Sequence, residues 1–331
     1  MARSVLVTGA TGQIGAALAH ALLRRGDRVR CLARDPERAR RILGAGPELA
    51  AGDLGDADSL RTALAGMEAV CHLAGLASYW PARAAEMRAA NVHGTARVLD
   101  ACAGAGVATL LYTSSIATLG WVPADELGDE TTPYNWHRLG IAYFDTKYEA
   151  ERMVLADPRV AAVAVNPGLV FGAGDRNGNA VRFLREVAAG VPGFPPGATT
   201  AAVLADVVAG HLAALDRGRP GERYILGGSP LSFRELFAAI AGVVGVAAPC
   251  RRLAPWMLTA MGLMHTGLGR LGGREPRVSL PTCRILTRNR RYRSAKAVAE
   301  LNYPVSPLAD GLRACWEWYL DCGNQAARTA T

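Results

Sequence analysis

A glycine-rich turn near the N-terminus constrains the fold of this chain more than any other feature. The turn follows a strand-like run at 4–8, opens a helical pattern at 14–23, and reads Thr8-Gly9-Ala10-Thr11-Gly12-Gln13-Ile14-Gly15. Glycines let a backbone approach a pyrophosphate closely, and the N-terminus of the helix offers it free N–H groups. The pattern predicts a dinucleotide site, with a ligand-free turn as the alternative. The residues expected to bind the cofactor here are Gly9, Thr11, Gly12, Gln13, Ile14 and Gly15.

Short apolar runs alternate with helical patterns through the first half of the chain. The expected strands are 4–8, 29–33, 69–73, 109–113 and 161–165. Helical patterns between them begin at Pro36 and cover 84–103. Strands separated by helices of this length predict an α/β fold with a Rossmann-type, doubly wound parallel sheet.

The alternation of strand and helix patterns ends after Pro167. Pro and Gly become frequent there, and helical patterns follow. One of these patterns begins with Ser232 and Glu235, which are spaced as a capping box. We therefore predict a dinucleotide-binding domain over 1–170 and a smaller, mostly helical substrate-binding lobe over 171–331. The lobe is expected to interleave with the first domain and not to fold independently.

Residues at the ends of the predicted strands indicate how the rest of the cofactor is held. Arg34 follows the second strand and no acid stands at the strand tip, so we expect NADP(H) to be favoured over NAD(H). The alternative is that Arg34 stacks on adenine or faces solvent. Asp53, followed by Leu54, is placed to bind the adenine amino group. Other strand-end residues expected against the cofactor are Leu73, Ala74, Gly75 and Thr113.

Tyr143 and Lys147 are four residues apart in a helical pattern and therefore share one face of a helix. A nearby ammonium lowers the pKa of a phenol, which can then exchange a proton with a substrate oxygen while hydride moves to or from nicotinamide. Lys147 should also hold the nicotinamide ribose, and it is one of only two lysines in the chain. Ser114 and Ser115 place hydroxyls at the end of a strand, where they can orient a carbonyl. The alternative is an ordinary helix with Tyr143 in the core.

Together these motifs resemble the extended short-chain dehydrogenase/reductase superfamily, also called the NAD-dependent epimerase/dehydratase superfamily. The resemblance covers about the first 230 residues and continues more loosely to the end. Besides the glycine turn, it depends on Gly52-Asp53-Leu54, His72-Leu73-Ala74-Gly75, Asn91-Val92-His93-Gly94-Thr95, Tyr112-Thr113-Ser114-Ser115, Tyr143 with Lys147, and Asn166-Pro167-Gly168-Leu169-Val170-Phe171-Gly172. The resemblance implies that Ser115 is the catalytic serine, beside Tyr143 and Lys147. It also implies that Pro167, Gly168 and Val170 contact the nicotinamide end.

Within that superfamily the chain is most similar to dihydroflavonol-reductase-like and 3β-hydroxysteroid-dehydrogenase-like enzymes, and to a bacterial branch called hopanoid-associated sugar epimerase. The segments that indicate this are 112–120, Asp129-Glu130-Thr131-Thr132-Pro133, Glu222-Arg223-Tyr224-Ile225-Leu226-Gly227-Gly228 and Arg274-Glu275-Pro276-Arg277-Val278. The stretch 195–202 contains no cation, although sugar-nucleotide enzymes usually bring basic residues to the diphosphate there. This absence disfavours a nucleotide-sugar substrate.

Three functions are compatible with these residues. The leading one is an NADP-dependent oxidoreductase that interconverts a ketone and a secondary alcohol on an apolar, ring-containing molecule of sterol, triterpenoid or flavonoid type. Aromatic residues expected to line its substrate pocket, or else to pack in the core, are Tyr79, Trp80, Trp121 and Trp136. The second is a nucleotide-sugar epimerase or dehydratase. The third is a non-catalytic dinucleotide sensor, which the intact Ser115, Tyr143 and Lys147 argue against.

The charge of the chain, +8 overall, is concentrated in one segment. Residues 249–296 contain ten arginines, one lysine and a single acid, and they surround an apolar stretch at 253–271. This combination predicts either peripheral contact with an anionic membrane through 251–293 or a core helix with solvated arginines. No apolar run reaches the ~20 residues that span a bilayer. We expect a cytoplasmic protein, peripheral at the membrane, with no nucleic-acid partner and with a second copy of the chain as a candidate partner. The seven cysteines form no C-x-x-C pair, so no metal site is expected.

Overall fold

The structure is a computed structural model that describes residues 2–176, 178, 180–276 and 278–329. Its main element is a seven-stranded sheet in the order β3-β2-β1-β4-β5-β6-β9, in which all neighbouring strands are parallel. The strands are β1 (Ser4–Thr8), β2 (Arg28–Ala33), β3 (Glu48–Ala51), β4 (Ala69–His72), β5 (Thr109–Thr113), β6 (Ala162–Pro167) and β9 (Arg223–Leu226). The predicted strands agree with β1, β2, β4, β5 and β6 to within two residues at each end.

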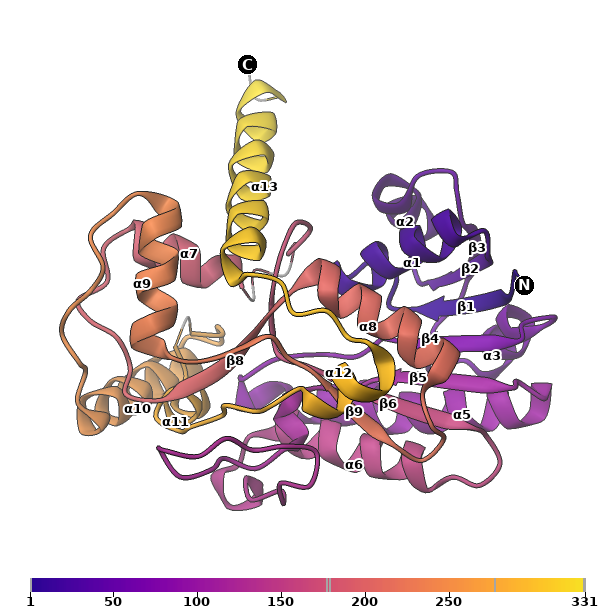
Figure 1. Cartoon of the computed structure of the whole chain (residues 1–331), viewed down its shortest axis with the longest axis horizontal. Coiled ribbons are helices and arrows are strands. Elements are labelled where there is room, and N and C mark those ends of the chain that lie inside the picture. The colour runs from indigo at the N-terminus through magenta and orange to yellow at the C-terminus, as the bar shows by residue number, and fades with distance from the viewer. Residues whose placement is uncertain (1, 177, 179, 277, 330–331) are drawn as a thin grey trace.

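Helices cover both faces of this sheet, as Figure 1 shows. One face is covered by α1 (Gln13–Arg25), α2 (Pro36–Leu43), α8 (Leu204–Arg217) and α12 (Ala295–Leu301), and the other by α3 (Ala57–Leu64), α5 (Gly94–Ala105) and α6 (Ala142–Ala156). Side chains alternate along a strand, so Val5 and Val7 of β1 are buried in the first core and Leu6 in the second. The doubly wound α/β fold predicted from the sequence is confirmed.

The C-terminal half forms a smaller lobe that is mostly helical, as expected, but it also contains a short sheet. Its helices are α7 (Val181–Ala188), α9 (Phe233–Val244), α10 (Pro255–Leu271), α11 (Leu280–Leu286) and α13 (Leu308–Thr329). The sheet has the order β10-β8-β7 and consists of β7 (Leu169–Phe171), β8 (Ala198–Val203) and β10 (Ser229–Ser232). The predicted capping box of Ser232 and Glu235 is present at the start of α9.

The two lobes are interleaved along the chain. Gly168 joins β6 of the large sheet to β7 of the small sheet, and the predicted boundary at 170 falls within β7. Later, β9 returns to pair with β6, so part of 171–331 completes the large sheet. A Cβ atom at Gly168 would lie 2.5 Å from the Thr200 carbonyl oxygen, so only glycine lets β6 pass this close to β8.

Candidate active site

The glycine turn is packed against the loop that follows β4. Gly9 has a φ of 73°, and a Cβ atom there would lie 2.6 Å from the backbone nitrogen of Ala74. A Cβ atom at Gly15 would lie 2.2 Å from the Gly9 carbonyl oxygen. The first turn of α1 has Gly12 at its N-cap, with no capping side chain and no acid. This end of the helix therefore keeps the N–H groups and the positive dipole end that suit a pyrophosphate. β1 and β4 are neighbours in the sheet, and strand order reverses there, which is where doubly wound folds bind ligands.

A directional chain of hydrogen bonds holds the turn and the β4 loop together, and sequence analysis did not find it. Ala74 N–H donates to Thr8 Oγ1 (3.2 Å), and Thr8 and His72 Nδ1 are 2.7 Å apart. His72 Nε2 lies 3.0 Å from Thr95 Oγ1, whose hydroxyl donates to the Asn91 carbonyl (2.6 Å). Because the Thr95 hydroxyl donates its proton to Asn91, Thr95 Oγ1 must accept a hydrogen bond from His72 Nε2–H. His72 is therefore neutral, with its proton on Nε2, and its Nδ1 accepts from the Thr8 hydroxyl. Burial lowers the pKa of His72 to about 3, which keeps it neutral.

Asn91 fixes the same loop to α6, the helix that carries Tyr143 and Lys147. Its amide accepts from Leu76 N–H (2.7 Å) and donates to the Leu76 carbonyl (3.0 Å) and to Thr146 Oγ1 (3.1 Å). Asn91 lies in a π-helical turn (Ala89–His93) between α4 (Ala84–Arg88) and α5, within the stretch predicted as one helix. Such turns are frequent at functional sites because they redirect a side chain. The sequence signal was the Asn91–Thr95 motif, but its spacing alone gives no role.

Arg34 lies just beyond β2, with 83% of its side chain exposed, and its Nε is 3.8 Å from Asp53 Oδ2. The other acid in this region, Asp35, accepts a hydrogen bond from Arg38 N–H and caps α2. Leu54 packs on the start of α5. A Cβ atom added to Gly94 would lie 3.1 Å from Leu54 Cδ1. The structure thus brings Arg34 and Asp53 together at the end of the sheet beside the glycine turn.

The remaining predicted cofactor residues differ in how open they are. The side chain of Gln13 donates to the Gly172 carbonyl (2.9 Å), which links α1 to the end of β7. Val170 is 9% exposed and packs in the core on the α1 face. Thr113 Oγ1 is 3.0 Å from His211 Nε2, and the Nδ1 of His211 is 2.7 Å from the Val207 carbonyl. The Thr113 side chain is therefore engaged by a neutral His211, whose pKa burial lowers to about 4.

Tyr143 and Lys147 share one face of α6, and Ser115 lies beside Tyr143. Burial raises the pKa of Tyr143, whereas the Ser115 side chain, through a hydrogen bond, and the charge of Arg290 lower it. The lowering expected from Lys147 is not seen, because Lys147 is engaged elsewhere. Its ammonium donates to the Tyr112 hydroxyl (2.7 Å) and to the Thr113 carbonyl (2.8 Å). Burial lowers the pKa of Lys147 to about 7, and Glu151 opposes that shift.

The two serines after β5 have different surroundings. Ser115 Oγ accepts from Ala117 N–H (3.1 Å) and caps the short 3₁₀ helix Ile116–Thr118. Ser114 Oγ is buried and has no hydrogen-bond partner among the described residues. A buried hydroxyl without a partner is costly, and Ser114 therefore differs from Ser115, whose oxygen is engaged as a cap.

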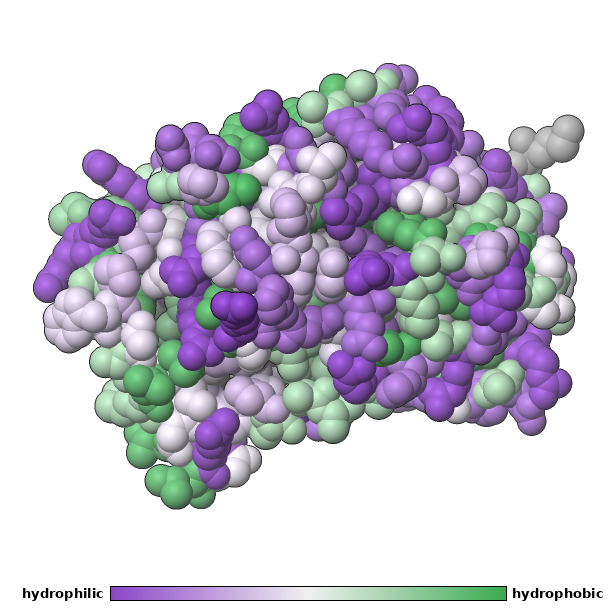
Figure 2. All heavy atoms as spheres, turned by 90° about the horizontal axis from the view of Figure 1, so that it is seen from below, coloured by the Kyte–Doolittle hydropathy of each residue, from purple (hydrophilic) through white to green (hydrophobic). Residues whose placement is uncertain are grey.

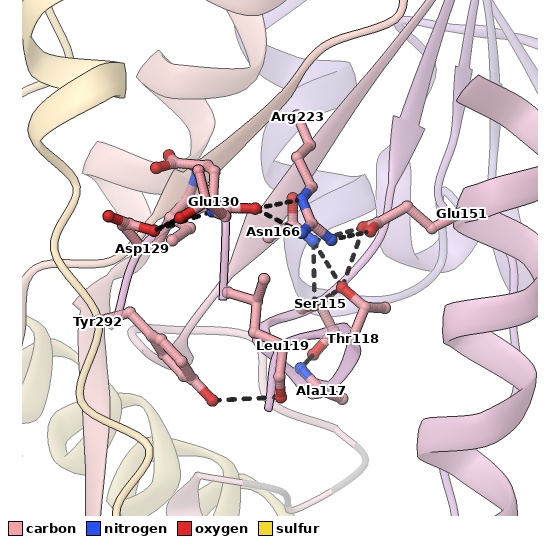
Figure 3. A network of polar contacts seen from close by, with 12 residues as sticks. Ser115, Ala117, Thr118, Leu119, Asp129, Glu130, Glu151, Asn166, Arg223 and Tyr292 are labelled. Atoms are coloured by element: carbon pink, nitrogen blue, oxygen red, sulfur yellow. Dashed lines mark hydrogen bonds and ion pairs between the residues drawn. The ribbon is translucent and has the colours of Figure 1, made fainter. Parts of the chain in front are cut away.

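A buried network anchors the Ser115 segment from behind, as Figure 3 shows. Asn166 Nδ2 donates to the Ser115 carbonyl (3.1 Å) and to Glu151 Oε2 (2.5 Å). Thr118 Oγ1 donates to the same Glu151 oxygen (3.1 Å), and Arg223 Nη1 pairs with Glu151 Oε1 at 2.8 Å. Glu151, four residues after Lys147, was missed by sequence analysis, although its helical spacing was a signal.

Arg223 connects this network to two of the segments that carry the family resemblance, 129–133 and 222–228. Its Nε donates to the Glu130 carbonyl (2.9 Å), and Glu130 Oε1 accepts from Ile225 N–H (2.9 Å). These contacts bring together the segments 129–133 and 222–228, which support the loop containing Ser115. The segments therefore have a structural role that requires no contact with a substrate.

The aromatic residues proposed as pocket walls form a cluster around Tyr143. Tyr79 meets Tyr143 edge-on at 5.9 Å between ring centroids. Trp121 is half-buried and meets Trp136 edge-on at 4.9 Å. Trp136 has no exposed surface, and its indole N–H donates to the Leu119 carbonyl (2.8 Å). Trp80 is also buried. Tyr79 and Trp121 thus keep exposed surface, whereas Trp136 and Trp80 are buried.

Several arginines expected on a solvated or membrane-facing surface instead point into this cluster. The guanidinium of Arg288 lies 5.3 Å from the Trp121 ring and that of Arg290 lies 5.7 Å from the Phe144 ring. Arg284 donates to the Leu139 carbonyl (2.5 Å). The expectation that the whole run 284–293 faces a membrane is therefore wrong, because cation–π contacts and backbone carbonyls draw these side chains inward. Arg277, part of the same basic segment, lies outside the described residues.

The fold and site together define an extended short-chain dehydrogenase/reductase. The chain matches the model of the NAD dependent epimerase/dehydratase family over residues 5–227, and it belongs to that family. The residues present fit the family's dinucleotide cofactor, because the glycine cradle is one that a Cβ atom would fill and the adjoining helix end is uncapped by side chains. Among the described residues, no group of His, Cys, Asp and Glu could hold a metal ion.

Named relatives match almost the whole chain. It is 31% identical to a Synechocystis protein named putative dihydroflavonol 4-reductase, covering 98% of this chain and 96% of that one. It is 30% identical to sterol demethylase protein B of Methylococcus capsulatus, covering 97% and 99%. Among solved structures it resembles gox2253 (33% identity, TM-score 0.81, covering 97% and 99%). It also resembles PA4631, titled a nucleoside-diphosphate-sugar epimerase from Pseudomonas aeruginosa (25% identity, TM-score 0.76, covering 97% and 98%).

Proposed function

We propose that this protein is an NADP-dependent reductase or dehydrogenase that interconverts a ketone and a secondary alcohol on an apolar, ring-containing molecule. The observation that carries the proposal is the convergence of Ser115, Tyr143 and the aromatic ring of Tyr79 at the end of β5. β5 is the neighbour of β4, whose following loop packs on the glycine turn. A non-catalytic dinucleotide sensor would not need a serine hydroxyl beside a half-buried phenol.

Each site residue has a distinct task in the proposed reaction. When bound, the nicotinamide supplies or accepts the hydride. Tyr143 gives its proton to the carbonyl oxygen during reduction and takes it back during oxidation. Ser115 donates a hydrogen bond that orients that oxygen, and Arg290 adds positive charge that favours the phenolate. Lys147, which contacts Tyr112 and Thr113 at the end of β5, would hold the ribose of the cofactor.

The substrate class follows from the cluster around Tyr143. Tyr79, Trp121 and Phe144 give it aromatic rings, which suit flat apolar molecules. The two relatives named for dihydroflavonol reduction and sterol demethylation are compatible with ring-containing substrates. The likeness to a nucleoside-diphosphate-sugar epimerase keeps a nucleotide sugar as the second candidate, and half-buried Arg288 and Arg290 are the cations that could meet its phosphates.

The preference for NADP(H) rests on Arg34. Its exposed guanidinium stands at the tip of β2, while Asp35 is committed to capping α2 and is not free to bind ribose hydroxyls. An exposed cation at this strand tip suits a 2′-phosphate, which would meet Arg34 in place of its long contact with Asp53 at 3.8 Å.

The test is turnover with each cofactor against a small panel of substrates. The panel contains a steroid ketone, a dihydroflavonol and a nucleotide sugar, and the oxidation of NADPH is followed by absorbance. We expect NADPH consumption with at least one of the ring ketones and none with the nucleotide sugar. Conversion of the nucleotide sugar alone, detected by chromatography of the products because it consumes no net NADPH, would assign the epimerase function instead.

A further inference from the structure

Helix α10 turns one face to the protein and an apolar face to the surrounding solvent. Its buried residues Leu258, Gly262 and Thr266 recur every four positions and form the inner face. The apolar side chains on the rest of the helix are widely exposed: Trp256 (72%), Met257 (36%), Leu263 (56%), Met264 (55%), Leu268 (60%) and Leu271 (88%). The expectation of a core helix therefore holds for the inner face only.

This outer face is unlike the rest of the surface. Among the described residues, six of the ten exposed large hydrophobic side chains lie on α10. Arg270 is the only Asp, Glu, Lys or Arg in the whole helix. Figure 2 shows hydrophobic side chains gathered on a protruding corner at lower left, the end of the molecule where Figure 1 places α10 and α11. A helix face exposed only to water is normally polar, and apolar patches of this kind mark contact sites.

Positive charge stands at both ends of the apolar face. Arg251 and Arg252 are exposed just before α10, and Arg270 and Arg274 are exposed at its end. The nearest acid in sequence, Glu275, accepts a hydrogen bond from Ser78 Oγ (2.9 Å). An apolar stripe between clusters of arginine matches the two layers of an anionic membrane surface, whose acyl boundary takes the apolar side chains and whose headgroups pair with the cations.

We propose that the outer face of α10, with Arg251, Arg252, Arg270 and Arg274, binds the surface of an anionic lipid bilayer. The contact is peripheral, since no helix in the described part of the chain is long and apolar enough to cross a membrane. A second copy of the chain is a poorer occupant. Two such faces meeting about a twofold axis would bring like-charged ends together, or leave both sets of arginines without a counter-charge.

Helices α10 and α11 contact the segment that carries Tyr79 of the candidate active site. Ser279, at the start of α11, donates to the Tyr79 carbonyl (2.9 Å), and a Cβ atom at Gly269 would lie 3.1 Å from the Trp80 ring. The helical pair α10–α11 thus packs directly on the 78–80 segment whose Tyr79 meets Tyr143. A bilayer in contact with α10 would lie beside the aromatic cluster. The membrane contact itself does not depend on the proposed reaction.

The test is co-sedimentation with vesicles of phosphatidylglycerol and phosphatidylcholine in equal parts, at low salt, with vesicles of phosphatidylcholine alone for comparison. We expect the full-length protein to sediment with the anionic vesicles and to be released at high salt. The double variant Arg251→Glu, Arg252→Glu should bind at least tenfold more weakly, because each arginine near an anionic surface contributes about a fivefold gain in affinity. The variant Leu263→Glu, Leu268→Glu should also lose binding, because it places charge on the apolar face.

Matched variants on other surfaces serve as controls. Arg40→Glu with Arg41→Glu changes the same charge on α2, and Val298→Glu with Val305→Glu changes two other exposed apolar residues; both should bind vesicles like the unmodified protein. The altered residues are exposed, so all variants should melt at the temperature of the unmodified protein. Absence of sedimentation with anionic vesicles at low salt would overturn the proposal. A dimer detected by sedimentation velocity would also overturn it if the Leu263→Glu, Leu268→Glu variant were the only one that is monomeric. The face would then be an interface between copies of the chain.

Discussion

Lys147 donates a 2.7 Å hydrogen bond from its ammonium to the hydroxyl of Tyr112, the penultimate residue of β5. A second bond of 2.8 Å reaches the Thr113 carbonyl. These two bonds tie α6 to the end of the strand that supplies Ser115. The lysine therefore acts on the strand end, and it does not lower the pKa of Tyr143. Burial raises that pKa above its ordinary value, and Ser115 and Arg290 only partly oppose the rise.

Replacing Tyr143 with phenylalanine should abolish most turnover while leaving cofactor binding intact. The change removes only the hydroxyl that exchanges a proton with the substrate, a contribution of roughly 10²–10⁴-fold. Steady-state kinetics and titration with NADPH measure the two effects separately. Tyr148→Phe, on the same helix, is the matched control and should keep full activity. Equal turnover of Tyr143→Phe and the unmodified protein would remove Tyr143 from the mechanism.

The low pKa of Lys147 should appear in the pH dependence of stability. Its pKa is about 7 in the folded protein and about 10.4 in an unfolded chain. Between these values the unfolded chain binds a proton that the folded protein does not, so this residue makes the free energy of unfolding rise with pH. The slope is about 1.4 kcal/mol per pH unit, and it vanishes below about pH 7, where both states are protonated.

Denaturant unfolding of the protein and of Lys147→Met, from about pH 7 to about pH 10, measures this slope as a difference between the two. Buried thiols such as Cys31 and Cys71, whose pKa values burial raises to about 12, oppose the slope equally in both proteins. Lys296→Met, the change at the other lysine, should keep the slope. If the free energy of unfolding changed with pH equally in Lys147→Met and in the unmodified protein, Lys147 would have to stay charged in the folded state.

Glu151→Gln should destabilise the protein and alter the site through Lys147. The change leaves Arg223 without its buried partner, which costs about 3 kcal/mol. Because Glu151 raises the pKa of Lys147, removing its charge should move that pKa further down. Chemical denaturation and NMR titration of the Lys147 ammonium check the two effects. Glu149→Gln, exposed on the same helix and paired with Arg88, should cost less than about 1 kcal/mol and leave the titration unchanged.

Arg34→Ala should weaken NADPH binding much more than NADH binding. A charge-assisted contact with the 2′-phosphate contributes roughly 1.5–3 kcal/mol, so NADPH affinity should fall by roughly tenfold or more. Calorimetric titration of both cofactors measures the difference. Arg61→Ala, an exposed arginine on α3, should change neither affinity. Tighter binding of NADH than NADPH by the unmodified protein would contradict the assigned preference.

The sequence alone determined five of the seven strands of the large sheet and the glycine turn, because these depend on local patterns. Strand and helix periodicity recur with a fixed spacing, and Gly9 and Gly15 are required by close approaches that no other residue allows. The Tyr143–Lys147 pair was also readable, since four residues place two side chains on one helical face. These features need no knowledge of what lies far away in the chain.

Only the tertiary structure decided which residues surround that pair. Arg290 and Ser279 act on the site from more than a hundred residues away. Glu151 of α6 gains its role from Asn166 on β6 and Arg223 on β9. Periodicity says which residues of α10 share a face, but whether that face meets protein or solvent depends on where α11 packs. The same basic segment therefore divides into arginines drawn inward by aromatic rings and arginines left exposed beside an apolar helix, because packing, which no local pattern encodes, determines their partners.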